Sequence, residues 1–338
     1  MSKRHLSDQQ TRRINHQHSQ RIANIKDKPI DESNLSAPQK GLIIAHYGRQ
    51  LEVQGIEGEH SGQIWRCHLR RNLEALVTGD IVIWQADNTN QIGVVSALMP
   101  RISLLTRPDP YQKIKPVASN ISLILIVFAP LPTPSLGLID RYLVACETVG
   151  IPALLVLNKS DLLDDATGAE LRNSLNEYKS LGYNSIEVSC LGDLSALRDH
   201  IGNHNVAFVG QSGVGKSSLI NVLLPHAMQR VNIISDNSQL GQHTTTTTRL
   251  FALTNGGALI DSPGIREFGL WHLNETQIQQ GFIEFRGLYG TCRFRNCQHQ
   301  SEPDCAIKLA ASEGKILTRR LDSLNRLLAE SQSNEKYS

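Results

Sequence analysis

The pattern at residues 210–217 constrains this 338-residue chain more than any other feature of its sequence. The octapeptide GQSGVGKS follows the short apolar run 206–209 and precedes an apolar, helix-like pattern at 218–224. A strand, a glycine-rich turn ending in Lys-Ser, and a helix, in this order, are typical of a Walker A phosphate-binding loop. The sequence therefore predicts a loop that binds nucleotide phosphates.

Each residue type in this loop has a separate role. Lys216 supplies a compact positive charge to the β- and γ-phosphates, and Ser217 supplies a hydroxyl to Mg²⁺. Glycines leave room for the backbone to approach a phosphate and to donate N–H hydrogen bonds to it. We expect the nucleotide contacts of the loop to come from Gly210, Gln211, Ser212, Gly213, Val214, Gly215, Lys216, Ser217 and Ser218.

Composition and charge favour a soluble, cytoplasmic protein, which we expect to be monomeric and to make no membrane contact. The longest apolar run, at 121–130, is too short to span a bilayer, and the N-terminus lacks the apolar core of a signal peptide. The formal net charge of +2 is unevenly distributed, because residues 1–30 are strongly basic. We expect residues 1–38 to form a basic, disordered tail, which either attracts an anionic partner or only increases solubility.

Short strands separated by turn residues follow this tail. The strand-like runs are punctuated by Gly, Asn and Asp and occupy residues 41–48, 50–53, 63–69, 80–84 and 91–95. Five short strands within about 70 residues are typical of a small closed barrel of the OB type. We place this all-β domain at residues 39–107.

Three arginines lie on one strand of the predicted barrel and on the loop that follows it: Arg66, Arg70 and Arg71. OB barrels often bind oligonucleotides, so these side chains are candidates for contact with RNA. Because a fold alone does not assign a function, a purely structural spacer is the alternative.

Alternating apolar strands and helices begin after a proline-containing linker, which we place at residues 108–117. Apolar runs at 121–128 and 152–157 flank an amphipathic pattern at 137–148. Continuous apolar strands separated by helices indicate a parallel sheet that is covered on both faces. We therefore predict an α/β nucleotide-binding domain at residues 118–272.

The tetrapeptide Asn-Lys-Ser-Asp at 158–161 follows the second apolar strand, at the edge where open α/β sheets bind ligands. Its Asp can accept two hydrogen bonds from guanine that adenine cannot donate, while the Asn and the Lys stem buttress the loop and cover the base. A later strand, at 185–188, ends where a backbone N–H can meet the guanine O6. With the phosphate loop, this motif predicts GTP rather than ATP. The expected base contacts are Asn158, Lys159, Ser160, Asp161, Ser189 and Cys190.

A run of threonines and a DxxG motif follow the phosphate loop. Hydroxyls at 244–248 suit a switch segment that completes the Mg²⁺ shell when a γ-phosphate is present, and an ordinary β-prone threonine run is the alternative. In the motif at 261–264, the Asp can hold Mg²⁺ through water, and the N–H of Gly264 can donate to the γ-phosphate. The predicted Mg²⁺ ligands are Ser217, Asp261 and one switch threonine, for which Thr245 and Thr246 are both candidates.

Three cysteines and a histidine lie close together near the C-terminus, namely Cys292, Cys297, His299 and Cys305. Three thiolates and one imidazole suit a closed tetrahedral site for one structural Zn²⁺. Disulfides are disfavoured in a reducing cytosol, and catalytic zinc normally keeps an open position. We predict a helical zinc-binding domain at residues 273–338, in which Arg293 and Arg295 could face RNA phosphates.

A helical pattern of apolar residues at 305–328 follows these ligands. Basic side chains are interspersed in it: Lys308, Lys315, Arg319, Arg320 and Arg326. We expect the apolar side to pack in a core, while the basic side chains could also contact a partner.

The order of the motifs is unusual for a GTPase, because the base-reading motif at 158–161 precedes the phosphate loop at 210–217. The α/β domain is therefore predicted to be circularly permuted. In this order, with the barrel and the zinc ligands, the chain resembles the RsgA family of bacterial, ribosome small-subunit-dependent GTPases. The resemblance implies an N-terminal OB domain, a C-terminal zinc domain, GTP and GDP as ligands, and the small ribosomal subunit as partner, through 16S rRNA and proteins.

The residue that orients the attacking water differs from the usual GTPase pattern. Many GTPases place a Gln directly after the DxxG motif, but here Ile265 follows Gly264, and an apolar side chain cannot orient water. The resemblance implies that His243 takes this role, beside Lys216 as the other catalytic candidate. A surface histidine is the alternative.

Two classes of function fit these features. The resemblance implies a GTP-hydrolysing ribosome biogenesis factor that binds the small (30S) subunit, assists its late maturation and is stimulated by it. The alternative is a GTPase switch that acts on a protein partner through its OB and zinc modules. RNA binding that weakens steeply with salt would favour the first class. A nuclease or RNA-modifying enzyme is disfavoured, because no candidate active-site cluster lies outside the nucleotide motifs.

Overall fold

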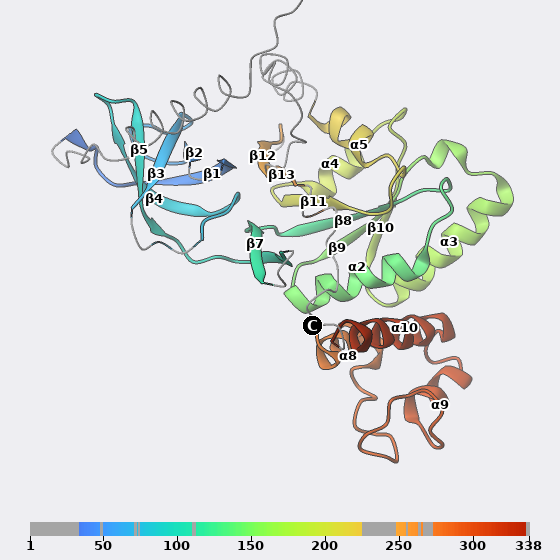
Figure 1. Cartoon of the computed structure of the whole chain (residues 1–338). Helices are drawn as coiled ribbons and strands as arrows, with labels where there is room; N and C mark the ends of the chain where they lie inside the picture. Colours follow the sequence, from blue (N-terminus) through green and yellow to red (C-terminus); the bar gives the residue numbers. More distant parts are fainter. Residues whose placement is uncertain are drawn as a thin grey trace, which may run out of the picture.

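The computed structural model describes residues 34–47, 50–70, 73, 75–109, 113–224, 248–254, 256–262, 265 and 273–335. Within them, the chain forms an N-terminal barrel, a central α/β domain and a C-terminal helical unit (Figure 1). No helix among these residues is long and apolar enough to cross a membrane. The predicted tail up to residue 33 lies outside the described residues, as do Arg71, His243, Thr245, Thr246 and Gly264.

The N-terminal strands close into a five-stranded barrel, which confirms the predicted OB type. They are β1 (Gln39–Tyr47), β2 (Gln50–Gly55), β3 (Ile64–Leu69), β4 (Ile81–Asp87) and β5 (Ile92–Leu98). The ring runs β1-β2-β3-β5-β4 and closes because β4 also pairs with β1. The β3–β5 pairing is parallel, and the other pairings are antiparallel. Trp65 and Trp84 fill the core with ring centroids 5.9 Å apart.

The predicted linker at 108–117 largely belongs to a β-hairpin. Strands β6 (Leu104–Pro108) and β7 (Ile114–Ser119) pair antiparallel, with a register shift after Leu105. Prolines suggested a linker because they lack the backbone N–H, yet edge strands and bulges tolerate them. The described chain also starts before the predicted tail ends, since the Ser36 N–H donates to the Ala86 carbonyl at 2.8 Å.

The central sheet has the strand order β10-β9-β8-β11-β13-β12. Its strands are β8 (Leu123–Phe128), β9 (Ala153–Leu157), β10 (Asn184–Glu187), β11 (Asn205–Val209), β12 (Arg249–Ala252) and β13 (Ala258–Asp261). All neighbours are parallel except β12, which is antiparallel to β13. The predicted parallel sheet is thus confirmed, with an antiparallel strand added beside β13.

Helices cover both faces of this sheet (Figure 1). They are α2 (Leu136–Val149), α3 (Asp165–Ser180), α4 (Ser195–Ile201) and α5 (Lys216–Leu223). Alternate residues of β8 belong to two separate cores: Ile124 packs with residues of α2 and α3, and Leu125 with residues of α4 and α5. The start of α3 is fixed by Asp164, whose carboxylate accepts a hydrogen bond from the Thr167 N–H at 2.7 Å.

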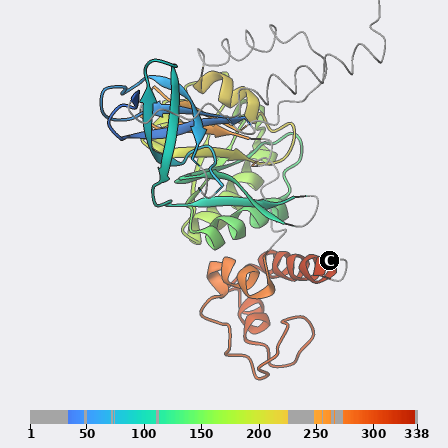
Figure 2. The same ribbon diagram turned by 60° about the vertical axis from the view of Figure 1, so that its left-hand side comes forward.

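The C-terminal unit packs against the α2 side of the sheet (Figures 1 and 2). It contains α8 (Glu275–Gly281), the 3₁₀ turn η3 (Ile283–Phe285), α9 (Ala306–Ser312) and α10 (Thr318–Glu335). The helical pattern predicted at 305–328 is two helices, because the chain turns at Gly314 with φ of 70°. Val144 of α2 belongs to the core of this unit, and a Cβ at Gly281 would lie 2.5 Å from its side chain.

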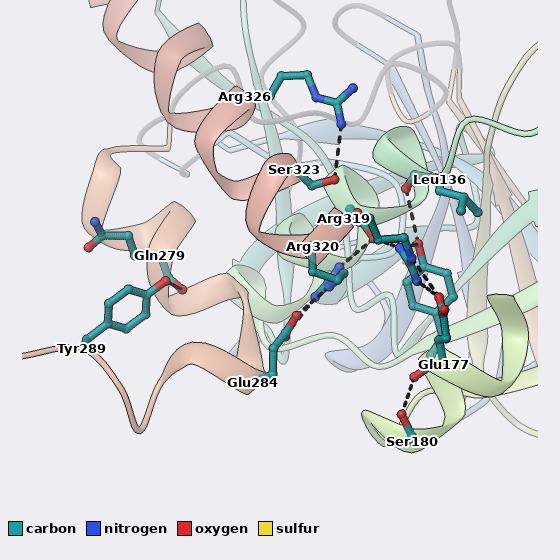
Figure 3. A network of polar contacts seen from close by, with 12 residues as sticks. Leu136, Glu177, Ser180, Gln279, Glu284, Tyr289, Arg319, Arg320, Ser323 and Arg326 are labelled. Atoms are coloured by element: carbon teal, nitrogen blue, oxygen red, sulfur yellow. Dashed lines mark hydrogen bonds and ion pairs between the residues drawn. The ribbon is translucent and has the colours of Figure 1, made fainter. Parts of the chain in front are cut away.

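A buried ionic cluster, formed by Asp140, Tyr178, Glu284 and Arg320, joins the C-terminal unit to the α/β domain (Figure 3). Arg320 is fully buried and donates from Nε to Glu284 at 2.6 Å and from Nη1 to Asp140 at 2.7 Å. The Tyr178 hydroxyl donates to the same Asp140 oxygen at 2.6 Å. Among the basic side chains of the 305–328 pattern that could contact a partner, Arg320 is therefore enclosed within the protein.

The charge states of the ionic cluster follow from its surroundings. Burial alone would lower the pKa of Arg320, but its hydrogen bonds with Glu284 and the charge of Asp140 outweigh burial and raise that pKa. Burial, with the nearby Asp140 charge, raises the pKa of the Tyr178 hydroxyl, so Tyr178 remains a neutral donor. Arg319 extends the cluster to α3, because it pairs with Glu177 at 2.7 Å and lies over the Tyr178 ring.

Candidate functional site

The candidate site lies at the carboxyl edge of the central sheet, where three predicted motifs meet. The phosphate loop follows β11, the Asn-Lys-Ser-Asp motif follows β9, and Asp261 ends β13. A cavity of about 580 Å³ opens there, and its lining includes residues of both the first and the second motif. Its lining residues are Lys159, Gly210, Ser212, Gly213, Gly215, Lys216, Ser217 and Ser218.

Two glycines of the loop are required by contacts within the protein itself. A Cβ at Gly210 would lie 2.0 Å from the Val127 carbonyl oxygen, and a Cβ at Gly215 would lie 2.3 Å from Nδ2 of Asn158. Gly215 also has φ of 91°, which side chains rarely allow. The sequence pattern predicts glycines here because a phosphate must approach, and the structure adds a second reason, since β8 and the Asn158 side chain leave no room for a Cβ.

The cationic end of the loop is fixed by its own backbone. Lys216 begins α5, and its Nζ donates to the carbonyl oxygens of Gly210 and Gln211, each at 2.7 Å. Lys216 and Ser217 also line a second, small cavity together with Asp261 and Ser262. Two of the predicted Mg²⁺ ligands, Ser217 and Asp261, therefore face the same space. Hydroxyl and carboxylate oxygens are the ligands that Mg²⁺ prefers.

The base-reading motif is hydrogen-bonded to the phosphate loop, as the predicted buttressing requires. Asn158 is fully buried and donates from Nδ2 to the Val214 carbonyl oxygen at 2.8 Å. Lys159 has φ of 58°, and its Nζ donates to the carbonyl oxygens of Leu131 and Gly213, each at 2.8 Å. The stem of Lys159 thus bridges two loops at the edge of the cavity.

The end of β10 lies beside the predicted base-reading carboxylate. The Ser189 hydroxyl donates to Asp161, which belongs to the 3₁₀ turn η2 (Ser160–Leu162). The Cys190 thiol lies 3.7 Å from the Asn158 side-chain oxygen. Burial is the largest of the effects that raise the pKa of this thiol, so Cys190 is neutral at physiological pH. The structure therefore brings Asn158, Asp161, Ser189 and Cys190 together at one edge of the sheet.

Two further residues, which belong to no predicted contact set, take part in this geometry. Leu131, whose carbonyl oxygen anchors Lys159, belongs to a proline-rich loop after β8, and a loop at this edge of a parallel sheet was the available signal. Ser262 accepts a hydrogen bond from the Thr248 hydroxyl at 2.8 Å. The DxxG motif does not predict this hydrogen bond, because the motif allows any residue type at position 262.

The four predicted zinc ligands also come together. Their ligand atoms all lie within 4.8 Å of one another, and three of the distances are 3.4 Å (His299 Nδ1 to Cys305), 3.6 Å (His299 Nδ1 to Cys292) and 3.9 Å (Cys292 to Cys305). Tetrahedral Zn²⁺ would separate two thiolates by about 3.8 Å and a thiolate from an imidazole nitrogen by about 3.6 Å. The cluster can therefore hold a metal ion, and its donor set fits zinc.

The candidate RNA-binding arginines are spread over two domains. Arg66, on β3, and Arg70 are exposed on the barrel, and Arg295 is exposed beside the metal cluster. Arg293 pairs with Asp304 at 2.6 Å and lies over the Phe294 ring, so it is already engaged within the protein.

Comparisons with known proteins agree with this geometry. The RsgA GTPase family model matches residues 98–271. Curated relatives named small ribosomal subunit biogenesis GTPase RsgA include one from Hahella chejuensis, 49% identical over 99% of this chain and 98% of the relative. One from Pseudomonas putida is 50% identical over 97% of this chain and 98% of the relative.

Solved structures show the same arrangement. The crystal structure of YjeQ from Thermotoga maritima has 26% identity and a TM-score of 0.70, and covers 87% of this chain and 99% of that chain. The structure of YloQ, described as a circularly permuted GTPase, has 27% identity and a TM-score of 0.68, and covers 91% of this chain and 98% of that chain. The predicted circular permutation is thus confirmed, and this chain belongs to the RsgA GTPase family.

Proposed function

We propose that this chain is a cytoplasmic, monomeric GTPase that binds the small ribosomal subunit and assists its late maturation. The proposal rests on relatives named small ribosomal subunit biogenesis GTPase RsgA, which are 49% and 50% identical to this chain over 99% and 97% of its length. The meeting of the phosphate loop, the base-reading motif and Asp261 at one sheet edge supports the nucleotide chemistry.

The guanine base would be read at the β9 and β10 edge. The Asp161 carboxylate, oriented by Ser189, accepts hydrogen bonds from the guanine N1 and N2 donors. Asn158 and Lys159 hold this loop against the phosphate loop, so base and phosphates are bound by one rigid frame. The backbone at Ser160 and Cys190 completes the base contacts.

The phosphates would lie over the N-terminus of α5. Lys216 and the N–H groups of residues 210–218 bind them, and Gly264 donates to the γ-phosphate. Ser217 and Asp261, with either Thr245 or Thr246, would hold Mg²⁺, which would neutralise the charge that develops on the phosphate oxygens. His243 orients the attacking water, because the side chain after Gly264 is the apolar Ile265.

The small subunit would be bound by the two appended domains. Exposed Arg66, Arg70 and Arg295 contact 16S rRNA phosphates, and Arg71, Arg293 and the basic tail add to them. Arg293 must exchange its partner Asp304 for a phosphate and is expected to contribute less. One structural Zn²⁺ on Cys292, Cys297, His299 and Cys305 holds the C-terminal unit in shape.

The decisive experiment measures GTP hydrolysis with and without small subunits, with large subunits and ATP as controls. Strong stimulation by small subunits alone is expected. GTP-specific hydrolysis that no subunit stimulates would contradict the ribosomal role and leave a GTPase that acts on a protein partner. Lys216→Ala should abolish turnover while the barrel stays folded.

Base reading has its own test. Asp161→Asn should weaken GTP binding about 100-fold, because the amide cannot accept both guanine hydrogen bonds, and should improve binding of xanthosine triphosphate. Asp165→Asn, the same change four residues further on at an exposed position, is the matched control. Unchanged nucleotide preference in Asp161→Asn would contradict the assignment.

Zinc is tested by metal analysis of the purified protein. One zinc per chain is expected, and Cys297→Ala should lose it. Cys67→Ala, which removes a buried thiol of the barrel, should keep it. Equal zinc content in the two variants would rule out the predicted ligand set.

A further inference from the structure

Strand β12 is shared between the α/β domain and the barrel. It pairs with β13 along four residues, from Arg249 opposite Asp261 to Ala252 opposite Ala258. On its other side it meets β1, with Ala45 opposite Arg249, so one continuous sheet runs through both domains. Because β13 ends at Asp261, this strand connects the barrel to a predicted Mg²⁺ ligand.

The barrel presents a stiff loop, residues 75–80, toward this strand. Asp80 is fully buried, and its carboxylate accepts hydrogen bonds from the Val77 N–H at 2.8 Å and from Arg101 Nε at 2.7 Å and Nη2 at 2.8 Å. A two-pronged guanidinium–carboxylate pair fixes geometry more firmly than a single contact. The loop can therefore hold a side chain in one place.

Hydrogen bonds from residues 119 and 120 lock this loop to the α/β domain. The Ser119 N–H donates to the Thr78 carbonyl oxygen at 3.0 Å, and Asn120 Nδ2 donates to the Gly79 carbonyl oxygen at 2.8 Å. A Cβ at Gly79 would lie 2.1 Å from the Ser119 carbonyl oxygen, so only glycine allows this approach. The position of Thr78 is thus set from both domains.

Two hydroxyls then connect the barrel to the DxxG motif. The Thr78 hydroxyl donates to the Thr248 carbonyl oxygen at 3.0 Å, and the Thr248 hydroxyl donates to the Ser262 hydroxyl at 2.8 Å. Thr78 and Ser262 are 1% and 3% exposed, so water does not readily replace these bonds. Thr248 is the last threonine of the run, and Ser262 directly follows Asp261.

We propose that Thr78, on the barrel, is a positioning residue for GTP hydrolysis that acts through Thr248 and Ser262 on the Asp261 loop. The inference rests on the proposed function, because it assumes that GTP is hydrolysed at this site. The predicted contacts to the base and to the phosphate loop do not involve Thr78 or Thr248. Loss of these two hydroxyls should therefore affect turnover more than nucleotide affinity. Reaction rates depend steeply on small displacements of positioned groups, which gives one hydrogen bond a measurable effect.

The test uses the full-length protein and steady-state hydrolysis of GTP. Thr78→Val, which keeps the shape and removes the donor, should lower kcat about five- to tenfold and leave KM and the Kd for GDP within about twofold. Thr78→Ser keeps the hydroxyl and should restore kcat. The matched control is Thr89→Val, an exposed threonine in the turn between β4 and β5, which should not change kcat.

A Thr248→Val background tests whether Thr78 acts through Thr248 and Ser262. In Thr248→Val the link to Ser262 is already broken, so adding Thr78→Val should lower kcat by less than about twofold. Equal losses in both backgrounds, an unchanged kcat in Thr78→Val, or failure of Thr78→Ser to restore turnover would each overturn the inference. A wild-type protein without GTPase activity would instead contradict the proposed function, so the two failures are distinguishable.

Discussion

The barrel and the C-terminal unit are attached to the α/β domain by different chemistry at different places. The barrel joins through strand pairing, backbone hydrogen bonds and two hydroxyls, next to β13 and Asp261. The C-terminal unit joins through the buried Asp140 on α2 and through Tyr178 and the partly exposed Glu177 on α3, and these helices follow the Leu131 and Asp161 loops. The barrel therefore attaches beside Asp261, on the predicted γ-phosphate side of the candidate site, and the C-terminal unit attaches to the helices that follow the loops on its predicted base side.

This difference predicts different responses to mutation. A buried ion pair is costly to break, because the partner charge is left without compensation. Hydroxyl and backbone contacts contribute less each, but they tolerate small movements without leaving a buried charge. We therefore expect substitutions at the C-terminal junction to lower the free energy of unfolding more than substitutions at the barrel junction.

The largest effect on stability is expected from Arg320→Met. It leaves the Glu284 carboxylate without its cation and leaves Asp140 only the more distant Arg319, at 3.6 Å, so it should lower the free energy of unfolding by about 3–5 kcal/mol. Urea unfolding, followed by circular dichroism, measures this. Arg326→Met, an exposed arginine on the same helix, should change stability by less than about 0.5 kcal/mol. A similar, small loss in both variants would show that the cluster does not anchor the unit.

An intermediate effect is expected at the barrel junction from Gly79→Ala. The residue has φ of 97°, and the added Cβ would meet the Ser119 carbonyl oxygen, so we expect a loss of about 1–3 kcal/mol. Gly62→Ala is a control in the same barrel, with φ of 78° and nothing within 4 Å of the new Cβ. The difference between the two variants in urea unfolding isolates the contact with the α/β domain, and no difference would argue against a close junction.

The smallest effect is expected from Glu52→Gln. Glu52 on β2 pairs with Arg249 on β12 at 3.4 Å, with side chains 19% and 28% exposed, and such pairs contribute about 0.2–1 kcal/mol. The loss in free energy of unfolding should be smaller in high salt, because dissolved ions screen partly exposed ion pairs. Lys40→Gln, which breaks the more exposed pair with Glu57 inside the barrel, provides the comparison. A loss in Glu52→Gln that is insensitive to salt would contradict this ranking.

Local sequence patterns predicted much of the fold and of the nucleotide site. The phosphate loop and the residues at 158–161 are short, contiguous motifs whose chemistry depends on neighbours in sequence, and the structure brings them to one cavity. The barrel strands alternate buried and exposed residues, as in β2, and this periodicity is readable without a structure.

Long-range polar contacts could not be predicted in this way. Arg320 lies on an amphipathic helix where a charge normally faces water, and its partners come from residues 140 and 284. Thr78 and Thr248 are ordinary polar residues until the fold places them together. Hydrophobic periodicity says which face is buried, but it does not reveal which polar groups meet across a domain junction.

The pairing of β1 with β12 also affects how the chain folds as it is made. Ala45 and Arg249 are about 200 residues apart, so the first strand of the barrel leaves the ribosome long before its partner on the α/β domain. The barrel itself can close once Leu98 has emerged, and the base-reading strands can pair next. The phosphate loop follows β11, and β11 can pair with β13 only after β13 has been synthesised. During translation, therefore, a nascent chain should acquire nucleotide binding late, only after residue 261 has been synthesised.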